Sequence, residues 1–120
     1  MGAQIITFAE PVEPELSTPA ADRLLSGSPT QSVSNYFTDA TNQFFSGRWA
    51  STPGKWRVRY SENEFCHITH GKVRITAQDG RVHQFGAGDS FVIPAGFEGT
   101  WEVMEDCVKL YAIFEAAAPR

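Results

Sequence analysis

Cysteine and clustered positive charge are scarce in this sequence of 120 residues. Its two cysteines, Cys66 and Cys107, are too few for a disulfide framework, and their spacing fits no zinc-binding pattern. Ten Lys and Arg residues stand against fourteen Asp and Glu residues, and the basic residues are scattered along the chain. Such a chain lacks the electrostatic footprint of a nucleic-acid-binding protein, so we expect no nucleic-acid partner.

Long apolar runs are also missing. No apolar stretch approaches the ~20 residues that a helix needs to span a bilayer. The opening residues, MGAQIITFAE, have neither the basic start nor the apolar core of a secretory signal. We therefore expect a cytoplasmic protein without a membrane partner.

The first part of the chain differs in composition from the rest. Residues 1–43 are rich in Pro, Ser and Thr, which favours extended or irregular structure, and we interpret them as an N-terminal arm. Within this arm the sequence predicts one short helix near residues 19–26. Thr18 can cap this helix, Pro19 suits its first turn, and Gly27 can end it.

The remaining residues, 44–120, have the pattern of short strands separated by turns. Trp56, Val58 and Tyr60 alternate with Arg57 and Arg59, which is typical of a half-buried strand. The dipeptide at positions 79 and 80, Asp-Gly, lies between two alternating runs and indicates a tight hairpin. About eight strands at roughly ten-residue spacing predict an all-β sandwich or barrel.

Two spacings within these residues resemble those of a known family. Glu64 and Gly71 are seven positions apart, and Gly88, Pro94 and Gly96 follow in the order Gly, five residues, Pro, one residue, Gly. Both motifs resemble those of the cupin superfamily, and the chain is similar to small single-domain cupins related to the cupin domain of ureidoglycine aminohydrolase. The resemblance implies a double-stranded β-helix, a jelly-roll-like barrel, in residues 44–120.

The resemblance also implies a metal site, and here the sequence departs from the family. Val58 and Tyr60 stand where the family has its first two histidines (Arg57 and Arg59 if the loop is one residue longer), and Gly99 stands where the second motif has its histidine. Of the four usual ligands only Glu64 remains. Since protein sites for transition metals normally supply three or four ligands, we predict no metal ligands and no cofactor.

Glu64 is nevertheless the central candidate for chemistry. On a strand it shares a face with Cys66, and we expect that face to point into the barrel. A carboxylate there needs a cationic or hydroxyl partner, and Lys109 lies in a mostly apolar strand. We predict Glu64 and Lys109 as the catalytic residues; the alternative is a purely structural ion pair or hydrogen-bond anchor. The residues predicted to line a ligand cavity are Tyr60, Cys66, Trp49, Trp101 and Tyr111.

These observations favour a small-molecule-binding protein whose ligand the sequence does not identify. Glu64 would be the cavity acid or base if the protein is an enzyme that works without a metal. Two alternatives stay open, a metal-dependent cupin enzyme acting on ureides or related small metabolites and a noncatalytic binding or regulatory module. Because barrels of this kind have sheet edges that natural proteins cover, we also expect a homodimer.

Overall fold

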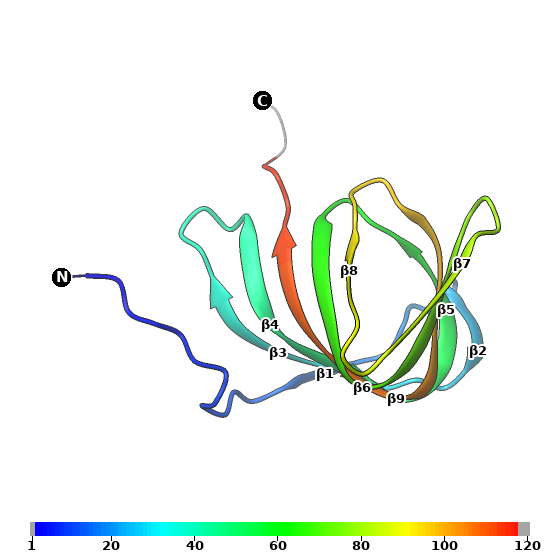
Figure 1. Cartoon of the computed structure of the whole chain (residues 1–120), viewed down its shortest axis with the longest axis horizontal. Coiled ribbons are helices and arrows are strands. Elements are labelled where there is room, and N and C mark those ends of the chain that lie inside the picture. Colours follow the sequence, from blue (N-terminus) through cyan, green and yellow to red (C-terminus); the bar gives the residue numbers. More distant parts are fainter. Residues whose placement is uncertain (1, 118–120) are drawn as a thin grey trace.

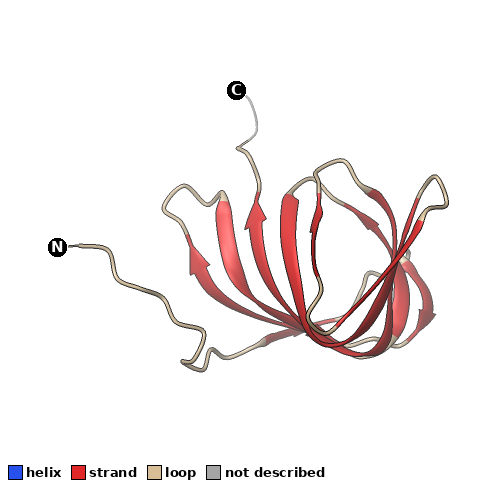
Figure 2. Cartoon of the chain, viewed as in Figure 1, coloured by secondary structure: helices blue, strands red, loops and turns tan. Residues whose placement is uncertain are grey.

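The computed structural model describes residues 2–117, and these form strands, turns and loops without a helix (Figure 2). The nine strands are β1 (Glu15–Ser17), β2 (Leu24–Gly27), β3 (Gln31–Thr38), β4 (Phe44–Ser51), β5 (Gly54–Arg59), β6 (Asn63–Ala77), β7 (Val82–Gly86), β8 (Ser90–Ile93) and β9 (Glu98–Phe114). All pairings are antiparallel. The all-β prediction is confirmed. Residues 2–117 contain no helix long and apolar enough to cross a bilayer.

Two long strands, β6 and β9, hold the sheet together. They pair with each other along most of their length. The first half of β9 also pairs with β5 and its second half with β4, while β6 pairs with β8 near its start and with β7 near its end. The sheet therefore has two halves that share the same two strands, and it curls round on itself (Figure 1).

The bend in β6 lies at Gly71. The strand continues through this glycine, so residues Asn63–Ala77 form one bent strand. Gly71 has a φ of +89°, and a Cβ atom at this position would lie 2.2 Å from the carbonyl oxygen of Asp106. The buried side chains of β6 stand at even positions up to Ile68 and at odd positions from Val73 on. The register shifts around Gly71 make this change possible, so the inner face of the strand stays inside on both sides of the bend.

The short helix predicted near residues 19–26 is also wrong. The chain makes a single turn there, in which the amides of Arg23 and Leu24 both donate to the carbonyl oxygen of Ala20, and it then enters β2. β2 pairs with β5, with Leu24 opposite Trp56. The capping signals were real local preferences, but backbone pairing with an existing strand outweighed them, since an isolated short helix gains little on its own.

The segment interpreted as an arm contributes three strands to the sheet. β3 pairs with β4 over nearly its whole length, β1 pairs with β3, and β2 pairs with β5. Before β1 the chain lies against β3, where Tyr36 and Ser34 donate to the carbonyl oxygens of Glu10 and Val12, and only the end nearest the N-terminus runs outward (Figure 1). The division into an arm, 1–43, and a barrel, 44–120, stays a prediction.

The hydrophobic core lies mainly in the half of the molecule that contains β5 and the end of β6. Its buried members are Trp56, Ile68, Val73, Ile75, Ile93, Trp101, Val103 and Cys107. On the inner surface of the other half the buried side chains include charged ones. Those charged side chains are where a functional site is to be sought.

Candidate functional site

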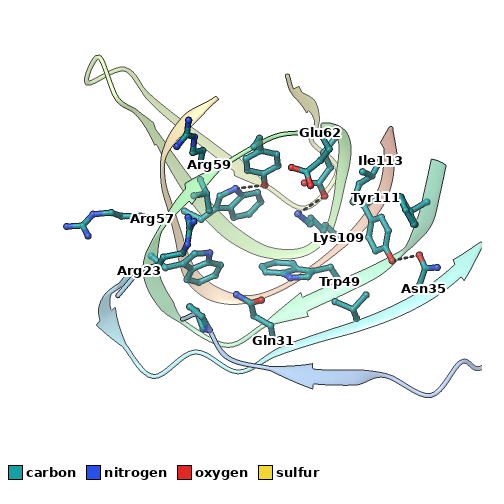
Figure 3. Close-up of a pocket in the computed structure, with 18 residues that line it drawn as sticks. Arg23, Gln31, Asn35, Trp49, Arg57, Arg59, Glu62, Lys109, Tyr111 and Ile113 are labelled. Atoms are coloured by element: carbon teal, nitrogen blue, oxygen red, sulfur yellow. Dashed lines mark hydrogen bonds and ion pairs between the residues drawn. The ribbon is translucent and has the colours of Figure 1, made fainter. Parts of the chain in front are cut away.

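A cavity of about 550 Å³ opens from the inner face of the sheet (Figure 3). Strands β3, β4, β5, β6 and β9 all supply side chains to its wall. The aromatic residues of the wall are Phe45, Trp49, Trp56, Tyr60, Trp101 and Tyr111, and its charged or amide-bearing residues include Gln31, Asn35, Glu62, Glu64 and Lys109. A concave, mostly aromatic wall with a few polar groups is typical of small-molecule sites.

A buried ion pair lies in the wall of this cavity. The Nζ atom of Lys109 lies 2.9 Å from Oε2 of Glu64, and each side chain is 6% exposed. The same Nζ atom lies 4.6 Å from the ring centre of Trp49 and 4.4 Å from that of Trp101. The ammonium is thus held by one carboxylate and by two indole faces, each of which attracts a cation.

This surrounding keeps Lys109 charged. Burial by itself would lower the pKa of Lys109, but the carboxylate of Glu64, together with Cys66 and Tyr60, raises it, and the net shift is well above the usual range. A lysine acts as a nucleophile or base only in its neutral form. Lys109 is therefore a fixed positive charge.

A tyrosine and a tryptophan extend the polar network. The indole Nε1 of Trp101 donates to the hydroxyl oxygen of Tyr60 over 3.1 Å. Burial raises the pKa of Tyr60 strongly, and the negative charge of Glu64 adds to this, so the phenol stays neutral. Among the described residues, no buried side-chain polar atom is left without a hydrogen-bond partner.

Tyr111 enters the cavity wall through a space that a glycine leaves open. Gly47 lies opposite Tyr111 on the neighbouring strand β4. A Cβ atom at Gly47 would lie 2.5 Å from the Tyr111 hydroxyl. That hydroxyl donates to Oδ1 of Asn35 over 2.8 Å, and burial raises the pKa of Tyr111 to about 12. The tyrosine is thereby fixed as a neutral hydrogen-bonding group.

Cys66 does not line the cavity. It is fully buried on β6, opposite Tyr111. Burial raises the pKa of Cys66 to about 12, with Glu64 adding to the effect and Lys109 opposing it. A thiol that holds its proton so firmly is a poor nucleophile, so Cys66 is a packing residue.

The structure thus brings together most of the residues singled out from the sequence. Glu64 and Lys109 form the expected contact, and Tyr60, Trp49, Trp101 and Tyr111 line the same cavity. Their roles in binding or catalysis stay predictions. Sequence reasoning missed Gln31 and Asn35 of β3, although Gln31, Val33 and Asn35 alternate with two serines and so carry a period-two strand signal.

Comparison with known proteins identifies the family. Residues 38–111, more than half of the chain, match the model of the EutQ-like cupin domain. The chain belongs to this cupin family. The predicted cupin fold is thereby confirmed, and the match also covers both motifs that the sequence analysis singled out. A comparison with curated proteins gives no significant match.

Solved structures agree on the fold of this cupin. A protein of unknown function of the DUF861 family from Pseudomonas syringae pv. tomato is 22% identical, with a TM-score of 0.79 over 90% of this chain. The chain spans 46% of that protein's length. EutQ from Clostridium difficile is 18% identical, with a TM-score of 0.67 over 81% of this chain and 73% of its own.

A third similar structure is described as a predicted oxalate decarboxylase from Thermotoga maritima. It is 18% identical, with a TM-score of 0.67, and the match covers 94% of this chain and all of that one. At such identities the likeness shows the fold alone. None of these three proteins is described as a ureidoglycine aminohydrolase, so that narrower resemblance stays a prediction.

The structure shows the surroundings of the four residues that stand at the metal-ligand positions of the cupin resemblance. Val58 has an apolar side chain, Tyr60 accepts a hydrogen bond from the Trp101 indole, and Glu64 is paired with Lys109. Gly99 has no room for any side chain, because a Cβ atom there would lie 2.1 Å from the carbonyl oxygen of Thr76. Hence a histidine at position 99 would require the strand to move.

Proposed function

We propose that this cupin domain binds a small organic molecule in its barrel cavity, beside the Glu64–Lys109 ion pair. The observation that carries the proposal is the combination of an open space of about 550 Å³ with aromatic walls and a buried ion pair in the wall. A purely structural ion pair would be expected in a filled core. Here it borders a cavity large enough for a small metabolite.

We further propose that the site works without a transition metal. The support is chemical: the one carboxylate left from the family's ligand set already has a cationic partner, and the other positions offer no strong ligand. Metal analysis of protein purified without a metal-binding tag, with melting curves in the presence and absence of EDTA, tests this point. Stoichiometric metal that is lost in a Glu64→Gln variant would contradict it.

If the bound molecule is transformed, the candidate acid or base is Glu64. Lys109 has its ammonium held between two indoles and a carboxylate, which makes it a fixed charge that supports Glu64. NMR spectra of a bound compound recorded over time would separate an enzyme from a noncatalytic binding module. A homodimer also stays a prediction, which light scattering can check.

The binding proposal is tested by filling the cavity. Val33 of β3 lines it and lies next to Trp49 across the β3–β4 pair. Val33→Trp would occupy the space and leaves both residues of the ion pair unchanged in the sequence. Val82, which is 54% exposed on β7, supplies the matched control Val82→Trp.

Thermal-shift screening of small neutral, acidic and basic metabolites gives the readout. We expect at least one compound to raise the melting temperature of the wild type and of Val82→Trp, and to leave Val33→Trp unchanged. A compound that stabilises Val33→Trp equally would place binding elsewhere, and a screen without any stabilising compound would contradict the proposed function.

A further inference from the structure

The charges of the cavity are arranged in two zones. Glu62, Glu64 and Lys109 are buried or half-buried in the inner wall, whereas Arg23, Arg57 and Arg59, which also line the cavity, are exposed. The guanidinium of Arg57 points away from the cavity (Figure 3).

Two of these three exposed arginines have partners. The Nε atom of Arg59 lies 3.1 Å from Glu98, and Nη1 of Arg57 donates to the carbonyl oxygen of Asp22 over 3.4 Å. Because all three arginines are exposed, water and salt screen their charges. The charges that a ligand meets in the buried part of the cavity are those of Glu62, Glu64 and Lys109.

An anion is disfavoured inside. The positive charge of Lys109 is balanced by Glu64 at 2.9 Å, so a ligand carboxylate would have to compete with a carboxylate already in place. Glu62 is half-buried in the same wall, and no ion pair joins it to any other described residue. The three inner charges sum to −1, which repels a second anion at short range.

A cation is disfavoured for a different reason. The indole faces of Trp49 and Trp101, which would attract a ligand cation, already hold the ammonium of Lys109. A second cation in the same aromatic space would face a fixed like charge. The two indole faces thus already hold a cation of the protein itself.

The groups that remain open to a ligand are hydrogen-bonding ones. Glu62 can accept protons, and the amide of Gln31, which can both donate and accept, lies on the other side of the cavity (Figure 3). Between them the wall is aromatic. The polar groups of Asn35, by contrast, are engaged by Tyr111, Thr38 and Phe37.

We propose that the cavity selects an uncharged, flat molecule that carries an amide group. Its N–H groups would donate to Glu62, its carbonyl oxygen would accept from Gln31 or from the ammonium of Lys109, and its ring would lie against the indoles. This inference rests on the proposed function, because it names the class of ligand for the same cavity. The Lys109 ammonium then serves as a built-in cation in a cupin that lacks the metal-ligand set.

Three probes of nearly equal shape test whether the cavity prefers an uncharged ligand. Benzoate, benzamide and benzamidinium carry charges of −1, 0 and +1 on the same ring. Their affinities can be measured by two-dimensional NMR, with the indole N–H signals of Trp49, Trp56 and Trp101 as reporters, since all three line the cavity. We expect benzamide to bind at least tenfold more tightly than either charged probe.

The outcomes separate the two proposals. Benzoate or benzamidinium binding as tightly as benzamide would overturn the ligand class and leave a small-molecule site in place. If none of the three shifts an indole signal, the amide class is overturned. The proposed function falls as well only if the broader metabolite screen also finds no ligand.

Variants that change one inner charge sharpen the test. Glu64→Gln frees Lys109 to pair with a ligand anion, so we expect the preference to move at least tenfold from benzamide toward benzoate. Glu62→Gln should move it the same way by a smaller factor, and it leaves the ion pair intact if Glu64→Gln fails to fold. Glu105→Gln, which removes an exposed carboxylate, is the control and should change nothing. An unchanged preference in Glu62→Gln and in a folded Glu64→Gln would overturn the proposal.

Discussion

Among the described residues three ion pairs join strands β6 and β9, and two of them, Glu64–Lys109 and Lys72–Glu105, have opposite surroundings. Glu64 and Lys109 are each 6% exposed, whereas Lys72 and Glu105 are 65% and 59% exposed, with a separation of 3.4 Å. The chemical groups are the same in both pairs. What differs is the face of the sheet: the first pair points into the barrel and the second lies outside, just beyond the bend at Gly71.

The comparison shows that an ion pair is not by itself a statement about stability. An exposed pair contributes little, because water and salt screen it. A buried pair gains more from its mutual attraction but loses the hydration of both charges, and a well-packed apolar pair often serves stability equally well. The presence of Glu64 and Lys109 in the wall of a cavity therefore points to function, in agreement with the proposed binding role.

Removing one partner of each pair should give the largest difference. Lys109→Met leaves the Glu64 carboxylate buried without a counter-ion, and we expect a loss of about 3–5 kcal/mol in the free energy of unfolding. Lys72→Met should cost less than about 1 kcal/mol. Urea denaturation of both variants checks this. Equal losses in the free energy of unfolding would mean that the buried pair is as well hydrated as the exposed one.

A smaller effect is expected from adding one methyl group at Gly47, beside the cavity residue Tyr111, and at Gly86, beside Lys72 of the exposed pair. In Gly47→Ala the new Cβ atom would meet the carbonyl oxygen of Ser34 at 2.3 Å and the Tyr111 hydroxyl at 2.5 Å. We expect a cost of about 1–3 kcal/mol from this overpacking. Gly86 lies beside Lys72, where the nearest atom would be 3.6 Å away, so Gly86→Ala should change stability by less than about 0.5 kcal/mol. Thermal melts of the two variants distinguish these outcomes, and similar melting temperatures would count against a tightly packed Tyr111.

The surroundings of the buried pair should also appear in the dependence of stability on pH. Burial raises the pKa of Cys66 to about 12 and that of Cys107 to about 11. A group with a higher pKa in the folded state binds its proton more tightly there. Its contribution to the free energy of unfolding is therefore complete below its pKa in the unfolded chain, and it is lost as the pH rises toward and through its pKa in the folded protein. We expect the free energy of unfolding to fall above about pH 9, by about 1.4 kcal/mol per pH unit for each such group.

Urea denaturation at several pH values between 7 and 11 measures this slope. Cys66→Ala removes one of the two thiols and should reduce this slope by about 1.4 kcal/mol per pH unit. Lys72→Met keeps both thiols and should leave their part of the slope unchanged. A slope that Cys66→Ala does not alter would show that this thiol is not the group responsible.

The smallest expected effect concerns salt. A double-mutant cycle on Lys72 and Glu105 should give a coupling of about 0.2–1 kcal/mol at low ionic strength, and this coupling should vanish in 1 M NaCl, where the screening length is about 3 Å. The corresponding cycle on Glu64 and Lys109 should be nearly insensitive to salt, because ions do not enter the packed wall. A strong salt dependence of the buried pair would indicate that the cavity is flooded by the electrolyte.

Local patterns in the sequence were enough to predict much of the fold. Alternation of Trp56, Val58 and Tyr60 with two arginines predicted β5, and the turn glycines at positions 88 and 96 together with Pro94 fixed the resemblance to cupins. These signals succeed because the side-chain period of a strand and the turn preference of glycine are properties of a few neighbouring residues. The same local rules failed at residues 19–26, where pairing of Leu24 with Trp56 replaced the expected helix.

The candidate site was only partly within reach of such rules. An inward Glu64 and its need for a partner follow from strand alternation and from the cost of burying a charge. Lys109 was predicted as that partner because it is a cation in a mostly apolar strand, but no local pattern sets the contact, since Lys109 lies 45 positions away on another strand. The contributions of Gln31 and Asn35 were missed, since the segment that carries them was interpreted as an arm.

The sequence by itself therefore determined the type of fold, the face on which Glu64 points and the absence of histidine at positions 58, 60 and 99, because each depends on residue types and on short spacings. Only the tertiary structure decided that Lys109 is the cation beside Glu64, that two indoles enclose it, and that no side chain fits at Gly99. These features depend on how β6 bends and on which strands then face one another. Such contacts join residues far apart in the chain, so no local pattern specifies them.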